Sequence, residues 1–209
     1  MSSKNHSVTS PKGTAIWPRL NEPDRKFQPE GVYSVRLRLE ENAASDFQSK
    51  LQRIADDLYK AECIKQGKKT LKRAPLPWGP ATDYDKENET RVEIEGELEF
   101  KFSMKAEVTT RAGKKWSQRP ALFDAKLHPM PEDSEIIGGG SIIRVSAEIY
   151  PWYTASLGFG ISLRPRAVQV IELRSGGATS NPAALGFEEE DGYTTVGAST
   201  FSDDADGDY

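Results

Sequence analysis

Apolar and polar residues alternate with a period of two over much of the chain, a pattern typical of β-strands with one buried face. The alternating segments cover residues 33–39, 92–108, 143–149 and 157–163. Shorter apolar stretches predict further strands at residues 13–17, 116–126 and 168–173. Pro18 ends the first of these and Pro120 interrupts the second, because proline lacks the amide that a strand ladder needs.

One segment follows the helical period instead. Its apolar residues recur three or four positions apart and are Phe47, Leu51, Ile54 and Leu58. This spacing predicts an amphipathic helix over residues 45–66, about six turns long. Ser45 and Gln48 match a capping box at its start, and Gly67 is placed to end it.

Proline and glycine predict the connections. Residues 68–80 and 133–140 are expected to be loops, and Thr109–Gly113 is expected to be a hairpin turn, since Gly113 accepts a positive φ. Many antiparallel strands with one inserted helix predict a mostly β fold. We expect a small closed antiparallel β-barrel with one inserted amphipathic α-helix.

Charge divides the chain into two parts. The last 35 residues hold eight of the 32 acidic side chains and none of the 28 Lys and Arg. Residues 1–174 therefore carry 28 basic against 24 acidic side chains, a formal charge of +4. A charged segment with little apolar content cannot bury enough surface to fold. We predict one domain over residues 1–174 and a disordered acidic C-terminal tail over residues 175–209.

Other features of composition limit the setting. The chain has one cysteine, Cys63, so an intramolecular disulfide is excluded and a reducing compartment such as the cytoplasm is expected. Neither a signal-peptide h-region nor a stretch approaching the roughly 18 apolar residues of a membrane span is present. The sequence therefore predicts a soluble protein that does not enter a membrane.

Aromatic residues stand beside Lys and Arg in several segments. A surface for single-stranded nucleic acid needs cations for phosphates and ring faces for unstacked bases. The candidate DNA-binding residues are Arg36, Arg38, Lys105, Lys114, Trp116, Tyr150, Trp152, Tyr153 and Arg164. These rings are also compatible with a place in the core. Because Pro151 breaks the strand ladder within the last cluster of rings, we expect at least one of them to be exposed.

Two glycines near that cluster have two possible explanations. Gly158 and Gly160 alternate with apolar residues, and either a tight barrel corner or the close approach of a ligand would require them. The barrel corner is the simpler interpretation.

Signals for catalysis are weak. The chain has no phosphate-binding GxxxxGK[ST] loop, and His6, His128 and Cys63 do not make a zinc site. A row of acids on one strand consists of Glu93, Glu95, Glu97 and Glu99. This row is interpreted as a charged outer strand face, with the carboxylates of a metal-dependent nuclease as the alternative. We predict no catalytic residue, metal or cofactor, and a protein-interaction module that ignores nucleic acid stays open as a third class.

The chain resembles the single-stranded DNA-binding proteins of T7-like bacteriophages. The resemblance rests on the terminal Asp206-Gly207-Asp208-Tyr209, the helix inserted between strands, and the segments Tyr150-Pro-Trp-Tyr153 and Gly158-Phe-Gly160-Ile-Ser-Leu-Arg164. It implies an OB-fold that coats single-stranded DNA in phage DNA replication, recombination and repair, in the cytoplasm of the infected host cell. It also implies a homodimer.

The resemblance further implies that the acidic tail binds the phage DNA polymerase and helicase-primase. The residues of the tail to which this role would pass are Asp203, Asp204, Asp206, Asp208 and Tyr209. The best-known tail of the family ends in Phe, so this chain differs by a hydroxyl group. Independently of the resemblance, electrostatics suggests that the tail competes with DNA for the basic surface of the domain.

Overall fold

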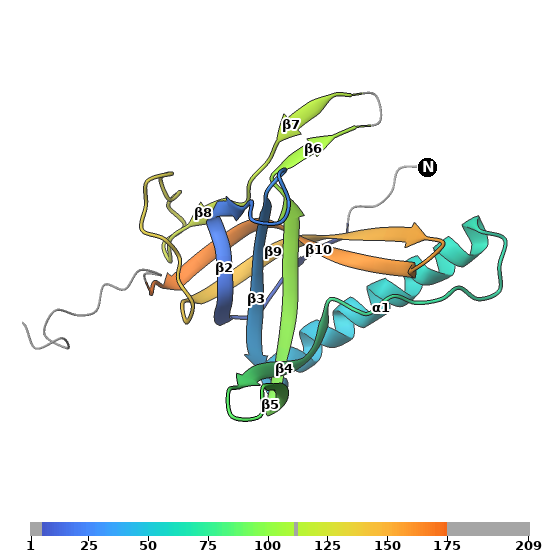
Figure 1. The fold of residues 1–209 in the computed structure, drawn as a ribbon, viewed down its shortest axis with the longest axis horizontal. Coiled ribbons are helices and arrows are strands. Elements are labelled where there is room, and N and C mark those ends of the chain that lie inside the picture. Colours follow the sequence, from blue (N-terminus) through green and yellow to red (C-terminus); the bar gives the residue numbers. More distant parts are fainter. Residues whose placement is uncertain (1–5, 111–112, 175–209) are drawn as a thin grey trace, which may run out of the picture. The chain divides into compact units, whose positions relative to one another are not determined.

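The computed structural model describes residues 6–110 and 113–174 (Figure 1). These residues are mostly β-strand and contain one α-helix. In chain order the elements are β1 His6–Thr9, β2 Gly13–Asp24, β3 Val32–Glu40, α1 Glu41–Lys65, β4 Trp78–Asp85, β5 Thr90–Lys105, β6 Glu107–Thr109, β7 Lys115–Ser117, β8 Ala121–Phe123, β9 Ile142–Thr154 and β10 Gly158–Glu172. The predicted tail, including its proposed partner-binding residues, lies outside the described residues, so the boundary at residue 174 stays a prediction.

Eight strands join in one sheet, in the order β1-β9-β2-β3-β5-β10-β8, with β4 paired to β5. An additional pairing joins β9 to β10, so five strands return on themselves in the order β9-β2-β3-β5-β10-β9. All contacts in this ring are antiparallel except that between β5 and β10. The β6–β7 hairpin forms a separate pair beyond the end of β5 (Figure 1).

Alternate residues of the ring strands point inward and build one apolar core. Its fully buried side chains include Val35, Leu37, Phe100, Phe102, Ile143, Val145, Leu163 and Val168. The outward residues between them are Ser, Arg, Lys, Glu and Tyr, which confirms the alternation read from residues 33–39 and 143–149. The register of these strands therefore decides which charged and aromatic residues share the outer face.

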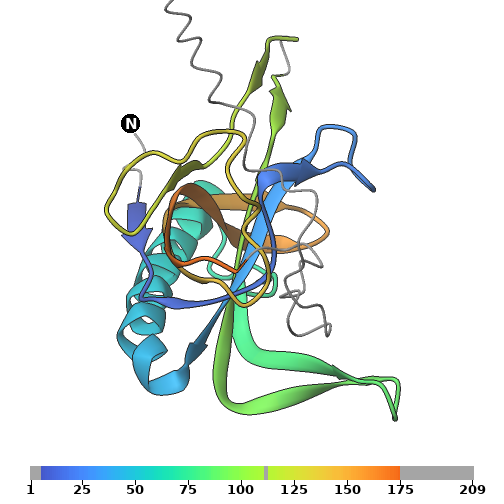
Figure 2. The same ribbon diagram turned by 90° about the vertical axis from the view of Figure 1, so that its left-hand side faces the viewer.

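Helix α1 packs against β3, β5 and β10 (Figure 2). Phe47 and Leu51 are buried on its inner face, and the Phe47 ring lies 5.1 Å from that of Phe100 between centroids. The predicted end is confirmed: Gly67 has φ +64°, and the next amide donates to the carbonyl of Cys63 in a Schellman arrangement. The predicted capping box is wrong, because the helix already begins at Glu41, after Glu40, and has no side-chain cap.

Proline misled the prediction of several boundaries. Strand β2 runs through Pro18, β4 begins at Trp78 inside the predicted loop over residues 68–80, and β10 is one strand through Pro165 where two were expected. Irregular pairing accommodates these prolines, with register shifts beside Pro18, Pro80 and Pro165. The short strand β1 was not predicted. The break at Pro120 and the turn at Gly113, with φ +80°, are confirmed.

Candidate nucleic-acid interface

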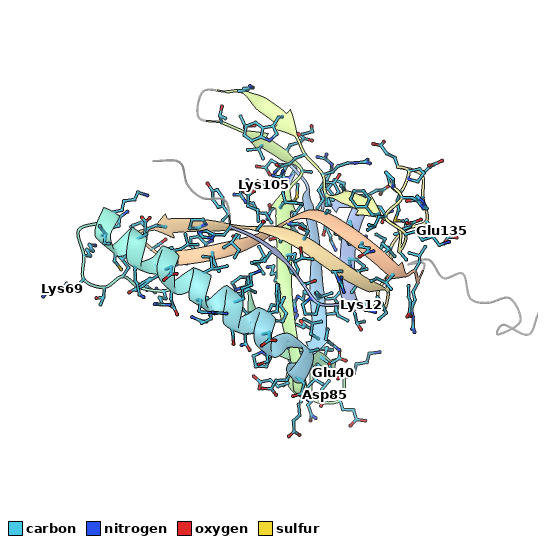
Figure 3. The ribbon with its side chains drawn as sticks, turned by 180° about the vertical axis from the view of Figure 1, so that it is seen from behind. Lys12, Glu40, Lys69, Asp85, Lys105 and Glu135 are labelled. Carbon is cyan, nitrogen blue, oxygen red and sulfur yellow. The ribbon has the colours of Figure 1, made fainter. Side chains whose placement is uncertain are left out.

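A groove of about 750 Å³ crosses the outer face of the sheet where β3, β5, β9 and β10 meet the β6–β7 hairpin. Its walls combine cations, hydroxyl groups and apolar rings. The lining residues are Asp24, Phe27, Gln28, Val32, Ser34, Lys101, Ser103, Met104, Lys105, Val108, Trp116, Gln118, Tyr150, Ser162 and Arg164. Lys105 stands at the end of β5 that carries the hairpin, opposite the end marked by Glu40 and Asp85 (Figure 3).

Strand register explains why these side chains meet. Ser34 pairs with Ser103 across β3 and β5, and Ser162 pairs with Tyr150 across β10 and β9. Each of the three serines lies between buried residues of its strand and therefore points outward, and Tyr150 follows buried Ile149. The single pairing of Leu163 with Phe102 brings these two halves of the surface together.

Tyr150 provides an accessible ring in this groove. Its side chain is 45% exposed, which confirms that at least one ring of the Tyr150–Tyr153 cluster faces solvent. The guanidinium carbon of Arg164 lies 3.5 Å from the centroid of this ring. A stacked Arg and Tyr form a flat cationic surface of the kind that binds bases and phosphates together.

The hairpin provides a second ring. Trp116 of β7 pairs with Val108 of β6, and both residues line the groove. Trp116 is 43% exposed although its indole is large and apolar. Phe27, in the loop between β2 and β3, adds a third exposed ring. Three aromatic side chains from three separate segments thus border one groove.

Basic side chains dominate the charge of the groove. Lys101, Lys105 and Arg164 line it, against one acid, Asp24. Lys105 also forms an ion pair with Glu30, with 3.4 Å between Nζ and Oε1. A backbone hydrogen bond lowers the pKa of Glu30, and the nearby Lys105 charge lowers it further. Glu30 is therefore ionised at neutral pH and restrains Lys105 beside the groove.

Two predicted DNA-contact residues have a different environment. Arg38 donates to Oε1 of Glu99 from Nη2 at 2.8 Å and to the carbonyl of Thr82 at 3.2 Å. Arg36 reaches the other oxygen of Glu99 at 3.3 Å. Glu99 is only 8% exposed, so the interpretation of its row as an outer charged face is wrong at this position. The sequence pattern alone did not reveal that two arginines converge on this acid.

The remaining predicted residues lie in two places: Trp152 and Tyr153 are on opposite faces of β9, and Lys114 is in the β6–β7 hairpin. Trp152 lies next to the groove, because its indole N–H donates to the hydroxyl of Ser162 at 3.1 Å. Tyr153 points to the opposite face and packs against the core. Lys114 is exposed in the hairpin turn, where its backbone pairs with Thr110, and it does not line the groove. The structure thus brings together Lys105, Trp116, Tyr150 and Arg164.

Sequence reasoning missed several groove residues. Lys101 and Ser103 alternate with buried Phe100 and Phe102, so the outward face of this strand was a usable signal. Phe27 has no such signal, because it stands in an irregular turn and reaches the groove only through the tertiary fold. Its exposed ring is found only in the structure.

The glycines near Trp152 have a structural explanation. A Cβ atom at Gly160 would lie 2.3 Å from the Trp152 indole, and one at Gly158 would lie 2.2 Å from the Lys72 carbonyl oxygen. Both positions are required for close packing within the chain itself. Gly160 thus allows the indole of Trp152 to lie against β10.

A metal-holding cluster and a membrane-spanning helix are both absent from residues 6–110 and 113–174. No group of three or more His, Cys, Asp or Glu side chains in this part of the chain is arranged to hold a metal ion. Within the same residues, no helix has the length and apolarity needed to cross a membrane.

Comparison with known proteins identifies the fold. Neither a family model nor a curated protein matches this sequence. The structure is similar to gp2.5, a single-stranded DNA-binding protein encoded by bacteriophage T7, with a TM-score of 0.65 and 23% identity over 91% of this chain and 98% of that one. The single-stranded DNA-binding protein of bacteriophage Enc34 in complex with ssDNA is also similar, with a TM-score of 0.55 and 16% identity over 82% of this chain and 89% of that one. The resemblance indicated by the sequence is confirmed for the fold.

Proposed function

We propose that this protein binds single-stranded DNA in the groove between β3, β5, β9 and β10. The observation that carries the proposal is the convergence of Tyr150, Trp116, Lys101, Lys105 and Arg164 on one surface. Exposed rings stack on unpaired bases, and cations neutralise the phosphates between them. Double-stranded DNA keeps its bases stacked on one another, so it offers no ring faces to this surface.

The topology supports the same surface. We infer that the ring of five strands is an OB-type barrel, with β2, β3, β5, β9 and β10 as its first to fifth strands. OB-folds bind oligonucleotides on the face of their second and third strands, between the loops that join strands one to two and four to five. In this chain those strands are β3 and β5, and the groove lies on them.

Binding is proposed to be independent of base sequence. Ring stacking accepts every base, and the lysines act as point charges toward the phosphate backbone. Arg38 and Tyr153 are not part of the proposed interface, because Glu99 holds the first and the core holds the second. No step of this function requires a catalytic residue, a metal or a cofactor.

The likeness to two phage proteins named for single-stranded DNA binding supports a role in phage DNA replication and recombination in the host cytoplasm. The homodimer and the polymerase and helicase-primase partners remain proposals based on the sequence resemblance. We further propose that the acidic tail competes with DNA for the groove. Deletion of residues 188–209 then tightens binding to single-stranded DNA, most strongly at low salt, and an unchanged affinity in a low-salt titration contradicts this competition.

Intrinsic tryptophan fluorescence tests the proposed binding directly. Titration with poly(dT) is expected to quench the emission, because stacked bases lie close to Trp116. Unchanged fluorescence, together with no shift of labelled poly(dT) in a gel, would contradict the proposal and favour an interaction module. Cleavage of the labelled strand in magnesium or manganese would instead indicate the nuclease class.

A further inference from the structure

Trp17 is an exposed tryptophan in the middle of a strand. In β2 the residues Gly13 and Ala15 are buried, so strict alternation would also direct residue 17 into the core. Trp17 is instead 59% exposed, and the buried positions resume at Leu20. The buried side chains therefore shift from odd-numbered to even-numbered positions between Ala15 and Leu20, and Trp17 lies in this interval.

A β-bulge produces this change. Ile16 pairs with Arg36 and Arg19 pairs with Ser34, so three steps along β2 correspond to two along β3. Trp17 has φ +45°, a backbone conformation that bulky residues rarely adopt, and it precedes Pro18, which restricts its backbone further. Backbone strain of this kind is concentrated at functional sites. The strained bulge places a large apolar ring in solvent.

Arg36, which also pairs with Glu99, lies beside this ring. The guanidinium carbon of Arg36 lies 5.2 Å from the centroid of the Trp17 ring. Arg36 pairs with Lys101 of β5, which lines the groove already described. A row of outward side chains therefore leads from the groove across β5 and β3 to Trp17 on β2, three neighbouring strands in Figure 1.

We propose that Trp17 is a second base-stacking site, on which a single strand bound in the groove places a further base after crossing β5 and β3. This inference rests on the proposed function and extends the same interface. Three strand spacings separate β10 from β2, about 14 Å, so the added site is reached only by an oligonucleotide long enough to cross the sheet. Lys101 lies on this path and is positioned for an intervening phosphate, while Arg36, which Glu99 holds, lies against the Trp17 ring.

The occupant is inferred from chemistry. A flat ring beside a guanidinium group and a lysine matches the alternation of base and phosphate along a nucleic acid strand. The Trp17 ring is exposed because the backbone adopts an unusual positive φ. A tryptophan exposed by chance would need no such backbone conformation.

The test compares Trp17→Gly and Trp17→Phe with the wild-type protein. Glycine adopts φ +45° without strain, so the Trp17→Gly variant removes the ring while the bulge is retained. Oligo(dT) of about 4 to 16 nucleotides is titrated at several salt concentrations. For the longer oligonucleotides we expect Trp17→Gly to weaken binding roughly 5- to 100-fold, within the range for one stacked base, with an unchanged salt slope. Trp17→Phe should restore most of the affinity.

Length dependence provides the sharper result. The shortest oligonucleotides fill the groove alone, so their affinity should be the same in wild type and Trp17→Gly. Tyr84→Ala is the matched control, since Tyr84 is an exposed ring on β4 that does not line the groove. A urea unfolding curve for each variant verifies that the fold is retained.

The outcomes separate this inference from the proposed function. If Tyr150→Ala weakens binding at every length while Trp17→Gly binds like wild type, the Trp17 site is overturned and the groove stands. If wild-type protein binds no oligonucleotide, the proposed function itself is overturned. If Trp17→Gly changes the oligomeric state and leaves all oligo(dT) affinities unchanged, the ring serves contact between copies of the chain and the inference is wrong.

Fluorescence provides an independent readout. A variant with Trp116→Phe and Trp152→Phe retains only Trp17 and the buried Trp78. Long oligo(dT) is expected to quench its emission, since only Trp17 among the two is accessible to a base. Bound oligonucleotide without quenching would contradict stacking on Trp17.

Discussion

Two groups of basic residues on the same sheet differ in what surrounds them. Arg36 and Arg38 converge on Glu99, which is almost fully buried, whereas Lys101, Lys105 and Arg164 border an open groove beside exposed rings. A buried carboxylate needs its cations to offset the cost of desolvation. The arginines around Glu99 therefore stabilise the fold, whereas the basic residues of the groove are accessible to a ligand.

The largest expected effect concerns the Glu99 cluster. Arg38→Ala removes the guanidinium group that makes the 2.8 Å contact with Glu99 and leaves a buried acid with less compensation. We expect the free energy of unfolding in urea to fall by about 2 to 4 kcal/mol. Lys101→Ala is the matched change in the groove and should lower it by less than about 0.5 kcal/mol. Equal losses for the two variants would remove the distinction between the groups.

The next effect concerns stacking in the groove. Tyr150→Ala is expected to weaken poly(dT) binding by about 1 to 3 kcal/mol, because a base loses its ring partner. The dependence of affinity on salt should stay the same, since no phosphate contact is removed. Tyr84→Ala, an exposed ring outside the groove, provides the control in the same fluorescence titration. Unchanged affinity for the Tyr150 variant would exclude this ring from the interface.

A smaller effect separates individual cations. Replacing Lys101 by Ala should reduce the slope of log affinity against log salt by about 0.7, the value for one phosphate contact with a single strand. Lys114 lies in the hairpin turn outside the groove lining, so Lys114→Ala should leave that slope nearly unchanged. A lower slope for Lys114→Ala would extend the DNA path to the tip of the hairpin.

The smallest expected effect is the contribution of the exposed Asp56–Arg73 ion pair to stability. A hydrogen bond from Arg73 lowers the pKa of Asp56, and a second one from Gln52 adds to this. The stabilisation is complete above the unfolded pKa of about 3.9 and is lost as pH falls through the lower folded value. Asp56→Asn should thus lower stability by less than about 1 kcal/mol at pH 7, since both partners are substantially exposed.

The difference in stability between Asp56→Asn and wild type should close as pH falls below about 3.9, because the wild-type carboxyl group then takes up a proton and becomes neutral, like the amide of the variant. Urea unfolding at a series of pH values measures this. A difference that persists at the lowest pH would show that the amide disturbs packing.

Local patterns predicted much of this fold. Period-two alternation located the long strands, and Gly67 marked the end of the helix, because both depend on residues close in sequence. Pro18 and Pro165 led to errors, since tertiary pairing tolerates a proline at an irregular register. The pairing that returns β9 to β10 and closes the ring of strands joins distant segments, and no local rule determines strand order.

Only part of the candidate site was predicted, because the sequence shows local patterns but not strand register. Tyr150 and Arg164 were found because aromatic residues stand beside basic residues in several segments of the sequence. The burial of Glu99 between Arg36 and Arg38 depends on the register of β3 against β5, so the sequence did not distinguish these arginines from Lys105. The sequence placed Trp17 in a strand but indicated no function for it, because a β-bulge cannot be recognised from the alternation of apolar and polar residues.

Lysine acetylation with and without an oligo(dT) ligand tests the central claim most directly, because it reads the intact protein without substitution. Mass spectrometry reports the rate of modification at each lysine. We predict that bound oligonucleotide protects Lys101 and Lys105 in the groove, while Lys50 and Lys60, exposed on α1, react at the same rate as in the free protein. Equal acetylation of Lys101 and Lys105 with and without saturating oligonucleotide would contradict the assignment of this groove as the DNA-binding surface.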